Sequence, residues 1–148
     1  YSIWIGKHAR SNDEMLSLAH KEDIWLHAKG VSGSHVVIRS HNKIPNKAVI
    51  EQVAAFAAYQ SKARGSAWVP VIFTPKKYVR KAKDAPPGAV IVQKEEVVVK
   101  KVPVTVYAES TPNPSVMKFI ANKPLVENSI EFKNIDEKNE LIDCRFEQ

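Results

Sequence analysis

A short segment near the amino end of the chain carries most of the side chains that could do chemistry. Residues 23–39 contain one tryptophan, two histidines and one arginine, and two apolar runs in this segment flank a loop with Gly30 and Gly33. This pattern predicts a β-hairpin. Side chains alternate along strands, so one face should carry Ile24, Leu26, Ala28, Ser34, Val36 and Ile38. The other face should carry Trp25, His27, His35, Val37 and Arg39.

The second of these faces could bind unpaired RNA bases, because aromatic rings stack on bases and histidine and arginine hydrogen-bond them. His27 and His35 should lie opposite each other across the hairpin. Three interpretations stay open for them: contact with a base or phosphate, a metal site, or a packed core. Metal binding is the weakest interpretation, because no carboxylate shares the face. The core interpretation is the serious rival, because Trp25 and Val37 share that face.

A second cluster, the basic stretch 76–83, places five cations around Tyr78. Lysine and arginine attract phosphates without sequence preference, and the phenol ring can stack on a base. The alternative is a solvated edge strand, in which lysines prevent edge-to-edge pairing. The candidate RNA contacts of this stretch are Lys76, Lys77, Tyr78, Arg80 and Lys81.

Further candidate phosphate contacts are Lys7 and Arg10, which precede a helix expected over residues 12–20. The first amides of that helix could meet a phosphate, although a capping box over residues 11–14 explains the local sequence equally well. The weaker candidates are loop and helix-end cations, which are usually only solvated: Lys29, Lys62 and Arg64.

The remaining elements complete a fold prediction. A second helix should follow Pro45 and end near Gly65, with an alanine-rich stripe facing a sheet. We expect a strand over residues 68–73, at a sheet edge because of Pro70, and a hairpin over residues 89–99. The predicted class is α+β: one mainly antiparallel sheet covered by two helices, with a short β-rich C-terminal appendage.

Charge divides the chain into two parts. Residues 1–101 hold 17 lysines and arginines against 8 acids, a net charge of +9, whereas residues 102–148 hold 5 against 8, a net charge of −3. We therefore expect two domains, 1–101 and 102–148, the first with a polyanionic partner. No apolar run is long enough to span a membrane. The lone Cys144 excludes an internal disulfide and a thiolate metal cage, which favours a reducing cytoplasm.

Catalytic signals are weak in this sequence. Ser34 and His35 are strand neighbours and should point to opposite faces, so the histidine is a poor base for the serine. Neither a phosphate-binding Walker loop nor a dinucleotide fingerprint occurs. The sequence therefore predicts a non-catalytic protein without a cofactor or metal.

Several separated blocks resemble the NFACT-R domain of RqcH-type ribosome quality-control factors. They are the hairpin segment 23–36, residues 6–13, residues 57–64, and residues 77–81 with 86–88. The resemblance implies an RNA-binding module that contacts tRNA or rRNA on the large ribosomal subunit during rescue of stalled ribosomes. The family's N-terminal lobe and coiled-coil arm have no counterpart here, so it also implies one part of a larger factor.

Residues 104–131 are similar to the start of the N-terminal domain of Nfu-type iron–sulfur scaffold proteins. The cluster-binding Cys-x-x-Cys of those proteins has no counterpart in this sequence, so we expect no iron–sulfur role. A different class of function also stays open, that of a protein-interaction or adhesion module, because relatives of the NFACT-R family are described as fibronectin binders.

Overall fold

The computed structural model describes residues 1–6, 8–41, 43–101, 106–110, 116–121, 130–136 and 141–146. Its elements in chain order are β1 (Ser2–Gly6), α1 (Ala9–Leu18), β2 (Ile24–Ala28), β3 (Val36–Arg39), α2 (Lys47–Tyr59), β4 (Trp68–Pro75), the 3₁₀ turn η1 (Lys76–Tyr78), β5 (Val79–Arg80), β6 (Ile91–Val92), β7 (Glu96–Lys101), β8 (Val106–Ser110), β9 (Val116–Ala121), β10 (Ile130–Asp136) and β11 (Leu141–Phe146).

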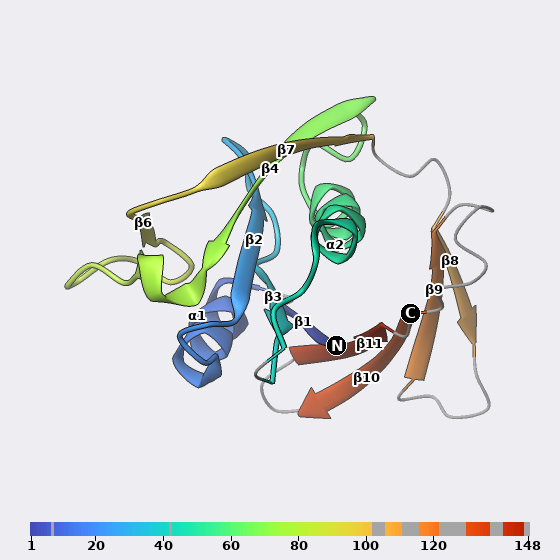
Figure 1. The fold of residues 1–148 in the computed structure, drawn as a ribbon, viewed down its shortest axis with the longest axis horizontal. Coiled ribbons are helices and arrows are strands. Elements are labelled where there is room, and N and C mark those ends of the chain that lie inside the picture. The colour runs from blue at the N-terminus through green and yellow to red at the C-terminus, as the bar shows by residue number, and fades with distance from the viewer. Residues whose placement is uncertain are drawn as a thin grey trace.

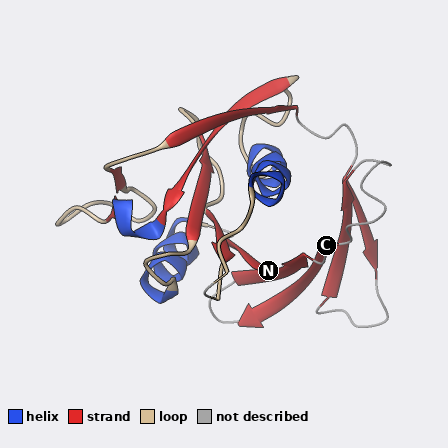
Figure 2. Cartoon of the chain, viewed as in Figure 1, coloured by secondary structure: helices blue, strands red, loops and turns tan. Residues whose placement is uncertain are grey.

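One antiparallel sheet organises these elements. Its strand order is β7-β4-β2-β3-β1-β11-β10-β9-β8, and β5 and β6 form a small second sheet. The first five strands of that order belong to residues 1–101, and β8 to β11 extend the sheet through pairing of β1 with β11. Helices and strands are drawn in Figure 2. The structure confirms the α+β class and the β-rich C-terminal segment.

Both faces of the β2–β3 hairpin are covered. In Figure 1 the sheet bends around α2, while α1 lies on the other side of β2 and β3. Leu26 and Val36 pack on the α2 side with the buried alanines of that helix, and Trp25 and Val37 pack on the α1 side with Met15. The two predicted faces of the hairpin are therefore correct, and each lies in a core.

The helix boundaries differ from those predicted. α1 begins at Ala9, because His8 supplies the cap: its Nδ1 accepts from the Ser11 amide at 3.2 Å, and Ser11 Oγ accepts from the His8 amide at 2.9 Å. α2 ends at Tyr59, so Lys62 and Arg64 lie in the turns beyond it. The expected helix end near Gly65 is wrong.

Two strand predictions are also wrong. β4 is an interior strand between β2 and β7, although it contains Pro70. The carbonyl of Pro70 accepts from the Lys29 amide at 2.9 Å, so the nitrogen of Pro70 also points toward Lys29. Lys29 follows the last paired residue of β2, so the missing N–H of Pro70 disturbs the β2–β4 ladder only at its end. Residues 89–99 form no hairpin, because β6 pairs with β5 and β7 pairs with β4.

Gly6 lies where β1, α1 and the hairpin meet. A Cβ atom at Gly6 would collide with the Asn12 side chain, whose Oδ1 accepts from the His35 amide at 3.2 Å. The Gly6 amide itself donates to the His35 carbonyl at 3.0 Å. This close approach makes glycine necessary at the end of β1.

We predict that Gly6→Ala lowers the free energy of unfolding by about 3 kcal/mol, because the new methyl group must displace Asn12 from a packed site. Urea unfolding followed by circular dichroism measures this loss. Gly65→Ala is the matched control, since a Cβ there meets nothing within 4 Å, and it should change the free energy by less than about 0.5 kcal/mol. Equal effects of the two substitutions would contradict this packing constraint.

Candidate nucleic-acid interface

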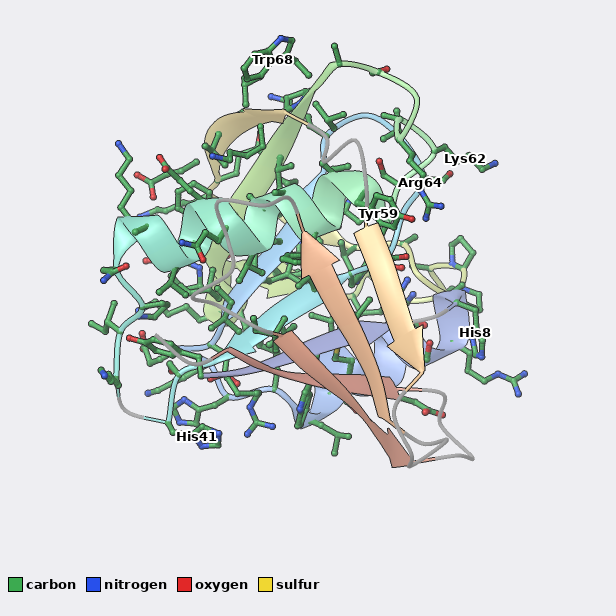
Figure 3. All side chains as sticks on the ribbon, turned by 90° about the vertical axis from the view of Figure 1, so that its right-hand side faces the viewer. His8, His41, Tyr59, Lys62, Arg64 and Trp68 are labelled. Carbon is green, nitrogen blue, oxygen red and sulfur yellow. The ribbon has the colours of Figure 1, made fainter. Side chains whose placement is uncertain are left out.

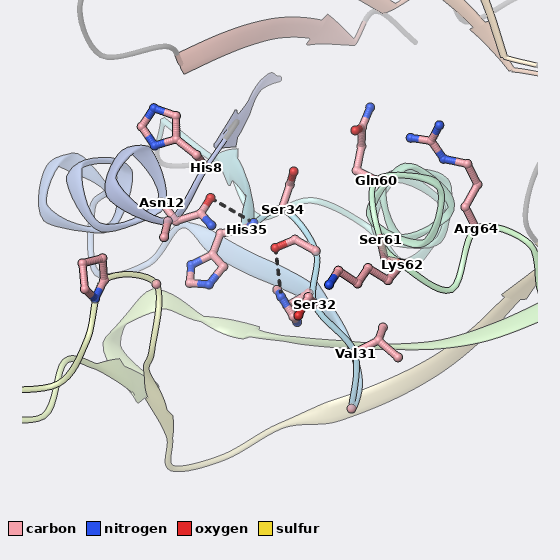
Figure 4. Close-up of a pocket in the computed structure, with 16 residues that line it drawn as sticks. His8, Asn12, Val31, Ser32, Ser34, His35, Gln60, Ser61, Lys62 and Arg64 are labelled. Atoms are coloured by element: carbon pink, nitrogen blue, oxygen red, sulfur yellow. Dashed lines mark hydrogen bonds between the residues drawn. The ribbon is translucent and has the colours of Figure 1, made fainter.

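A broad groove of about 780 Å³ opens at the end of the β2–β3 hairpin. Its walls are the hairpin loop, the start of α1, the residues just after α2 and the turn at Pro87 and Gly88 (Figure 4). Its side chains include His8, Asn12, His27, Gln60, Lys62 and Arg64. Among the described residues that line it there is no carboxylate, so the groove can accept an anion without repulsion from its own walls.

Backbone hydrogen bonds hold the hairpin loop against the end of α2. The Lys62 amide donates to the Ser32 carbonyl at 2.8 Å, and the Ser34 amide donates to the Gln60 carbonyl at 3.0 Å. Gly33 forms an isolated bridge with Ser61, and a Cβ at Gly33 would lie 3.0 Å from the Ser61 Cβ. These contacts fix the backbone that carries Lys62, whose side chain reaches across the groove in Figure 4.

Arg64 stands at the rim of the groove. Its Nε donates to the Tyr59 carbonyl at 2.7 Å, and its guanidinium carbon lies 3.9 Å from the centre of the Tyr59 ring. The residue is exposed, and Figure 3 shows Tyr59, Lys62, Arg64 and His8 along one side of the molecule. The guanidinium is thus held in place while its remaining donors face solvent.

The three rings predicted to form an open stacking platform lie instead at or below the groove floor. Trp25 is 1% exposed and His35 is 3% exposed, because Met15, Ile72 and Val79 cover this face. Trp25 and His35 therefore offer no open face on which a base could stack, and their burial favours the core interpretation for both rings. His35 still borders the groove, and His27, which is half-buried, lines it as well.

The predicted opposition of His27 and His35 is confirmed, with ring centres 5.2 Å apart. Burial lowers the pKa of His27, while hydrogen bonds to the carbonyls of Ala28 and Gly33 partly oppose that shift. Burial, assisted by the nearby His27, lowers the pKa of His35 to about 4. Both rings are neutral at pH 7, so neither supplies the positive charge that attracts a phosphate.

Arg39 serves the fold. Its Nε lies 2.8 Å from Oδ2 of the buried Asp23, and its guanidinium carbon lies 4.0 Å from the centre of the Trp4 ring. The Asp23 carboxylate also accepts from the amides of His20 and Ser40. The predicted RNA contact by Arg39 is not supported, because the guanidinium already neutralises a carboxylate that is 2% exposed.

Two lysines of the basic stretch form ion pairs with acidic side chains. Lys77 Nζ lies 3.1 Å from Glu22 Oε1, and Lys81 Nζ lies 3.0 Å from Asp13 Oδ1. Asp13 Oδ1 also accepts from the Gly88 amide at 3.0 Å, so Lys81 and Asp13 together fasten the groove wall at residues 86–88 to α1. Lys81 therefore positions backbone as well as adding charge, whereas Lys77 pairs with an exposed glutamate.

The other members of the basic stretch are more open. Arg80 is exposed, and no carboxylate of the described residues pairs with it; Lys76 is half-buried. Both line a second cavity of about 450 Å³ between this stretch and α1. The ammonium groups of Lys77 and Lys94 lie 5.5 and 5.1 Å from the Tyr78 ring centre, so the ring already takes part in cation–π contacts within the domain.

The remaining predicted contacts scatter around the groove. Arg10 is exposed in the first turn of α1, and Lys29 is exposed with its Nζ 3.4 Å from Glu95 Oε1. Lys7 lies outside the described residues. Sequence reasoning missed His8 and Gln60 as groove residues, because only the tertiary fold brings residues 8, 60 and 88 together.

Among the residues the structure describes, no group of three or more histidines, cysteines, aspartates or glutamates is placed to hold a metal ion. In the same residues, no helix has the length and apolar character that crossing a bilayer requires.

Comparison with known families supports both resemblances seen in the sequence. Residues 1–94 match the family model described as "NFACT protein RNA binding domain". Residues 106–147 match the one described as "Scaffold protein Nfu/NifU N terminal". Residues 95–105, which include the change in charge along the chain, separate the two matches.

Similar proteins are all much longer than the matched region. "Rqc2 homolog RqcH" of Bacillus subtilis (strain 168) is 44% identical over 90 residues, 60% of this chain and 15% of that protein. "Coiled-coil domain-containing protein 25" of Bos taurus is 27% identical over 95 residues, 61% of this chain and 46% of that protein. The solved C-terminal structure of the fibronectin/fibrinogen-binding protein from Streptococcus suis is 36% identical with a TM-score of 0.63, covering 68% of this chain and 41% of that one. The chain thus spans less than half the length of each.

We predict that acid destabilises the protein partly through His35. An unfolded chain protonates this histidine near its ordinary pKa of 6.5, whereas the folded protein keeps it neutral down to about pH 4. The contribution of neutral His35 to the free energy of unfolding is complete above pH 6.5, and this free energy falls by about 3 kcal/mol as the pH drops toward 4. Urea unfolding at several pH values should show a shallower dependence in His35→Gln than in the wild type, and parallel curves would contradict the assignment.

We also predict that two neighbouring cations of the basic stretch differ in role. Lys81→Ala should lower the free energy of unfolding by about 1–2 kcal/mol, because it leaves Asp13 without its cation and loosens the turn at residues 86–88. Arg80→Ala, the matched control, should change it by less than about 0.5 kcal/mol. Thermal unfolding of both variants measures the difference, and equal losses would mean that the Lys81–Asp13 pair adds nothing.

Proposed function

The chain belongs to the family of NFACT protein RNA binding domains, and we propose that residues 1–101 bind RNA through the groove at the end of the hairpin. The observation that carries the proposal is the groove itself: about 780 Å³ in volume, with Lys62 and Arg64 at its border and no carboxylate among its described lining residues. A cavity of this kind suits a phosphodiester backbone with its attached bases.

Electrostatics support a polyanionic partner. Residues 1–101 carry a net charge of +9. Among the described residues, five of their cations are paired with carboxylates inside the domain: Lys29, Arg39, Lys47, Lys77 and Lys81. Lys62, Arg64 and Arg10 are exposed near the groove, and the described residues hold no carboxylate partner for any of them. These three are therefore the cations that we assign to phosphate contact.

The biological role that we propose is ribosome-associated quality control. Its support is the 44% identity with a protein named "Rqc2 homolog RqcH", of which the chain covers 15%. In this proposal the domain acts in the cytoplasm as a non-catalytic part of a larger assembly, and it contacts tRNA or rRNA on the large ribosomal subunit of stalled ribosomes. RNA of either kind offers phosphates and unpaired bases to the groove.

A second candidate function is adhesion to a protein. It is favoured by the Streptococcus suis structure, whose title names a fibronectin/fibrinogen-binding protein. Salt separates the two functions. RNA binding that neutralises four to six phosphates should weaken with a log–log slope of roughly −3 to −4, since counterions are released. Binding of a protein ligand through apolar contacts should depend little on salt.

We predict that the double variant Lys62→Ala/Arg64→Ala binds single-stranded RNA about ten-fold more weakly and with a salt slope less steep by roughly 1.4, because two phosphate contacts are lost. Fluorescence anisotropy at several salt concentrations measures both quantities. The matched control is Lys43→Ala/Lys47→Ala, which removes the same charge near the start of α2.

Figure 3 shows His41 at the bottom of the view, away from Lys62 and Arg64 at the upper right. Lys43 follows His41 by two residues, and Lys47 is the first residue of α2. The control variant should keep the wild-type slope. If both double variants lose affinity equally, net charge and not the groove controls binding, and the assignment of the groove fails. A flat salt dependence of the wild type would instead favour the adhesion function.

A further inference from the structure

We infer that the exposed sheet face at Trp68, Val97 and Val99 stacks unpaired bases of the same RNA, as an extension of the groove. This inference rests on the proposed function. It replaces the stacking platform that the sequence led us to expect at Trp25, which the structure buries. The new platform lies on β4 and β7, at the open end of the sheet.

Strand register places the apolar side chains of this platform together. Pro70 pairs with Val99, and Ile72 pairs with Val97, so these side chains share one face. Trp68 lies two residues from Pro70 on that face. Val69, Val71 and Val98 point the other way, into the core with α2. This part of the sheet is therefore covered by α2 on one side; on the other side Ile72 is buried with Met15 and Trp25, while Trp68, Pro70, Val97 and Val99 are exposed.

The exposed part of that other side is conspicuously apolar for a solvent-facing surface. Trp68 is 61% exposed, Val99 is 55% exposed and Val97 is 46% exposed, and Pro70 between them is also exposed. In Figure 3, Trp68 projects from the end of the molecule, clear of the ribbon. A cluster of exposed apolar side chains of this kind marks a surface that binds something.

The platform is continuous with the groove. His27, which lines the groove, pairs across β2 and β4 with Ile72, and Ile72 pairs in turn with Val97. One residue further along, the Lys29 amide donates to the Pro70 carbonyl. In Figure 4, β4 and β7 run past the hairpin loop. A strand of RNA leaving the groove would therefore meet this sheet face next.

The chemistry of the platform and its border fits a single-stranded nucleic acid. An indole face, a proline ring and two valines give bases a flat apolar contact that does not depend on sequence. The cation that the groove offers beside this surface is Lys62, whereas Lys29 at the border is paired with Glu95 at 3.4 Å. Cations beside an open aromatic ring let the backbone phosphates be neutralised while the bases stack. Duplex RNA keeps its bases paired and cannot use such a surface.

Intrinsic fluorescence can report this contact directly. The chain has three tryptophans. Trp25 is 1% exposed, and the Trp4 ring is covered by the guanidinium of Arg39 at 4.0 Å, so Trp68 is the tryptophan that a base can reach. Single-stranded RNA should quench the fluorescence of the full chain, and the quenching should be lost in Trp68→Phe.

Affinity provides the second readout. Trp68→Ala should bind a short single-stranded RNA roughly 5- to 100-fold more weakly than wild type, because one base loses its stacking partner. Trp68→Phe keeps a stacking ring and should bind within about three-fold of wild type. Ile44→Ala is the matched control, since Ile44 is 85% exposed in the loop before α2, and it should bind like wild type. Thermal unfolding of all three variants should match wild type.

The possible results separate this inference from the proposed function. If Trp68→Ala binds like wild type while Lys62→Ala/Arg64→Ala loses affinity, the platform inference fails and the groove assignment stands. Equal weakening of duplex and single-stranded RNA binding by Trp68→Ala would also overturn stacking. If Trp68→Ala abolishes self-association or binding to a fibronectin fragment and leaves RNA affinity unchanged, the platform is a protein interface. Absence of any RNA binding by wild type would overturn both proposals.

Discussion

Burial of both faces of the β2–β3 hairpin is the constraint on which the rest of this structure depends. Leu26 and Val36 face α2 while Trp25 and Val37 face α1, so the hairpin is the layer that the two helices share. A strand pair buried on both sides has no face left for a ligand. Chemistry is therefore confined to the end of the hairpin, where the loop with Gly30 and Gly33 emerges between the ends of the two helices.

Internal electrostatics decide which cations remain for a partner. Asp23, which follows α1, pairs with Arg39. Asp13, within α1, pairs with Lys81 and accepts a hydrogen bond from the Gly88 amide. These cations count toward the net charge of residues 1–101 yet serve the fold. Lys62 and Arg64 differ because their backbone is held by the hairpin loop and by Tyr59 while their charged ends face the groove or solvent. Positive potential is thus concentrated where the backbone is already fixed.

Local patterns in the sequence predicted what depends on neighbours in the chain. Alternation identified the two faces of the hairpin and the opposition of His27 and His35, and the alanine stripe identified the buried side of α2. Alternation cannot say what covers each face, so for Trp25 and His35 it left base contact and core packing both open. The Lys81–Asp13 pair joins residues 68 apart in sequence, which no local pattern reveals. Pro70 led to the wrong prediction of an edge strand, because only the folded sheet shows that this proline lies opposite the end of β2.

RNA is proposed to meet this domain at the end of the hairpin and along the exposed face of β4 and β7. Amide chemical-shift mapping by NMR, with single-stranded RNA titrated into the isotope-labelled full chain, can locate the contact residue by residue. The largest shifts should fall on residues 29–35, 60–68 and 86–88 and on Val97 and Val99. Shifts confined to residues 43–51 or to β8 to β11, with those segments unchanged, would contradict it.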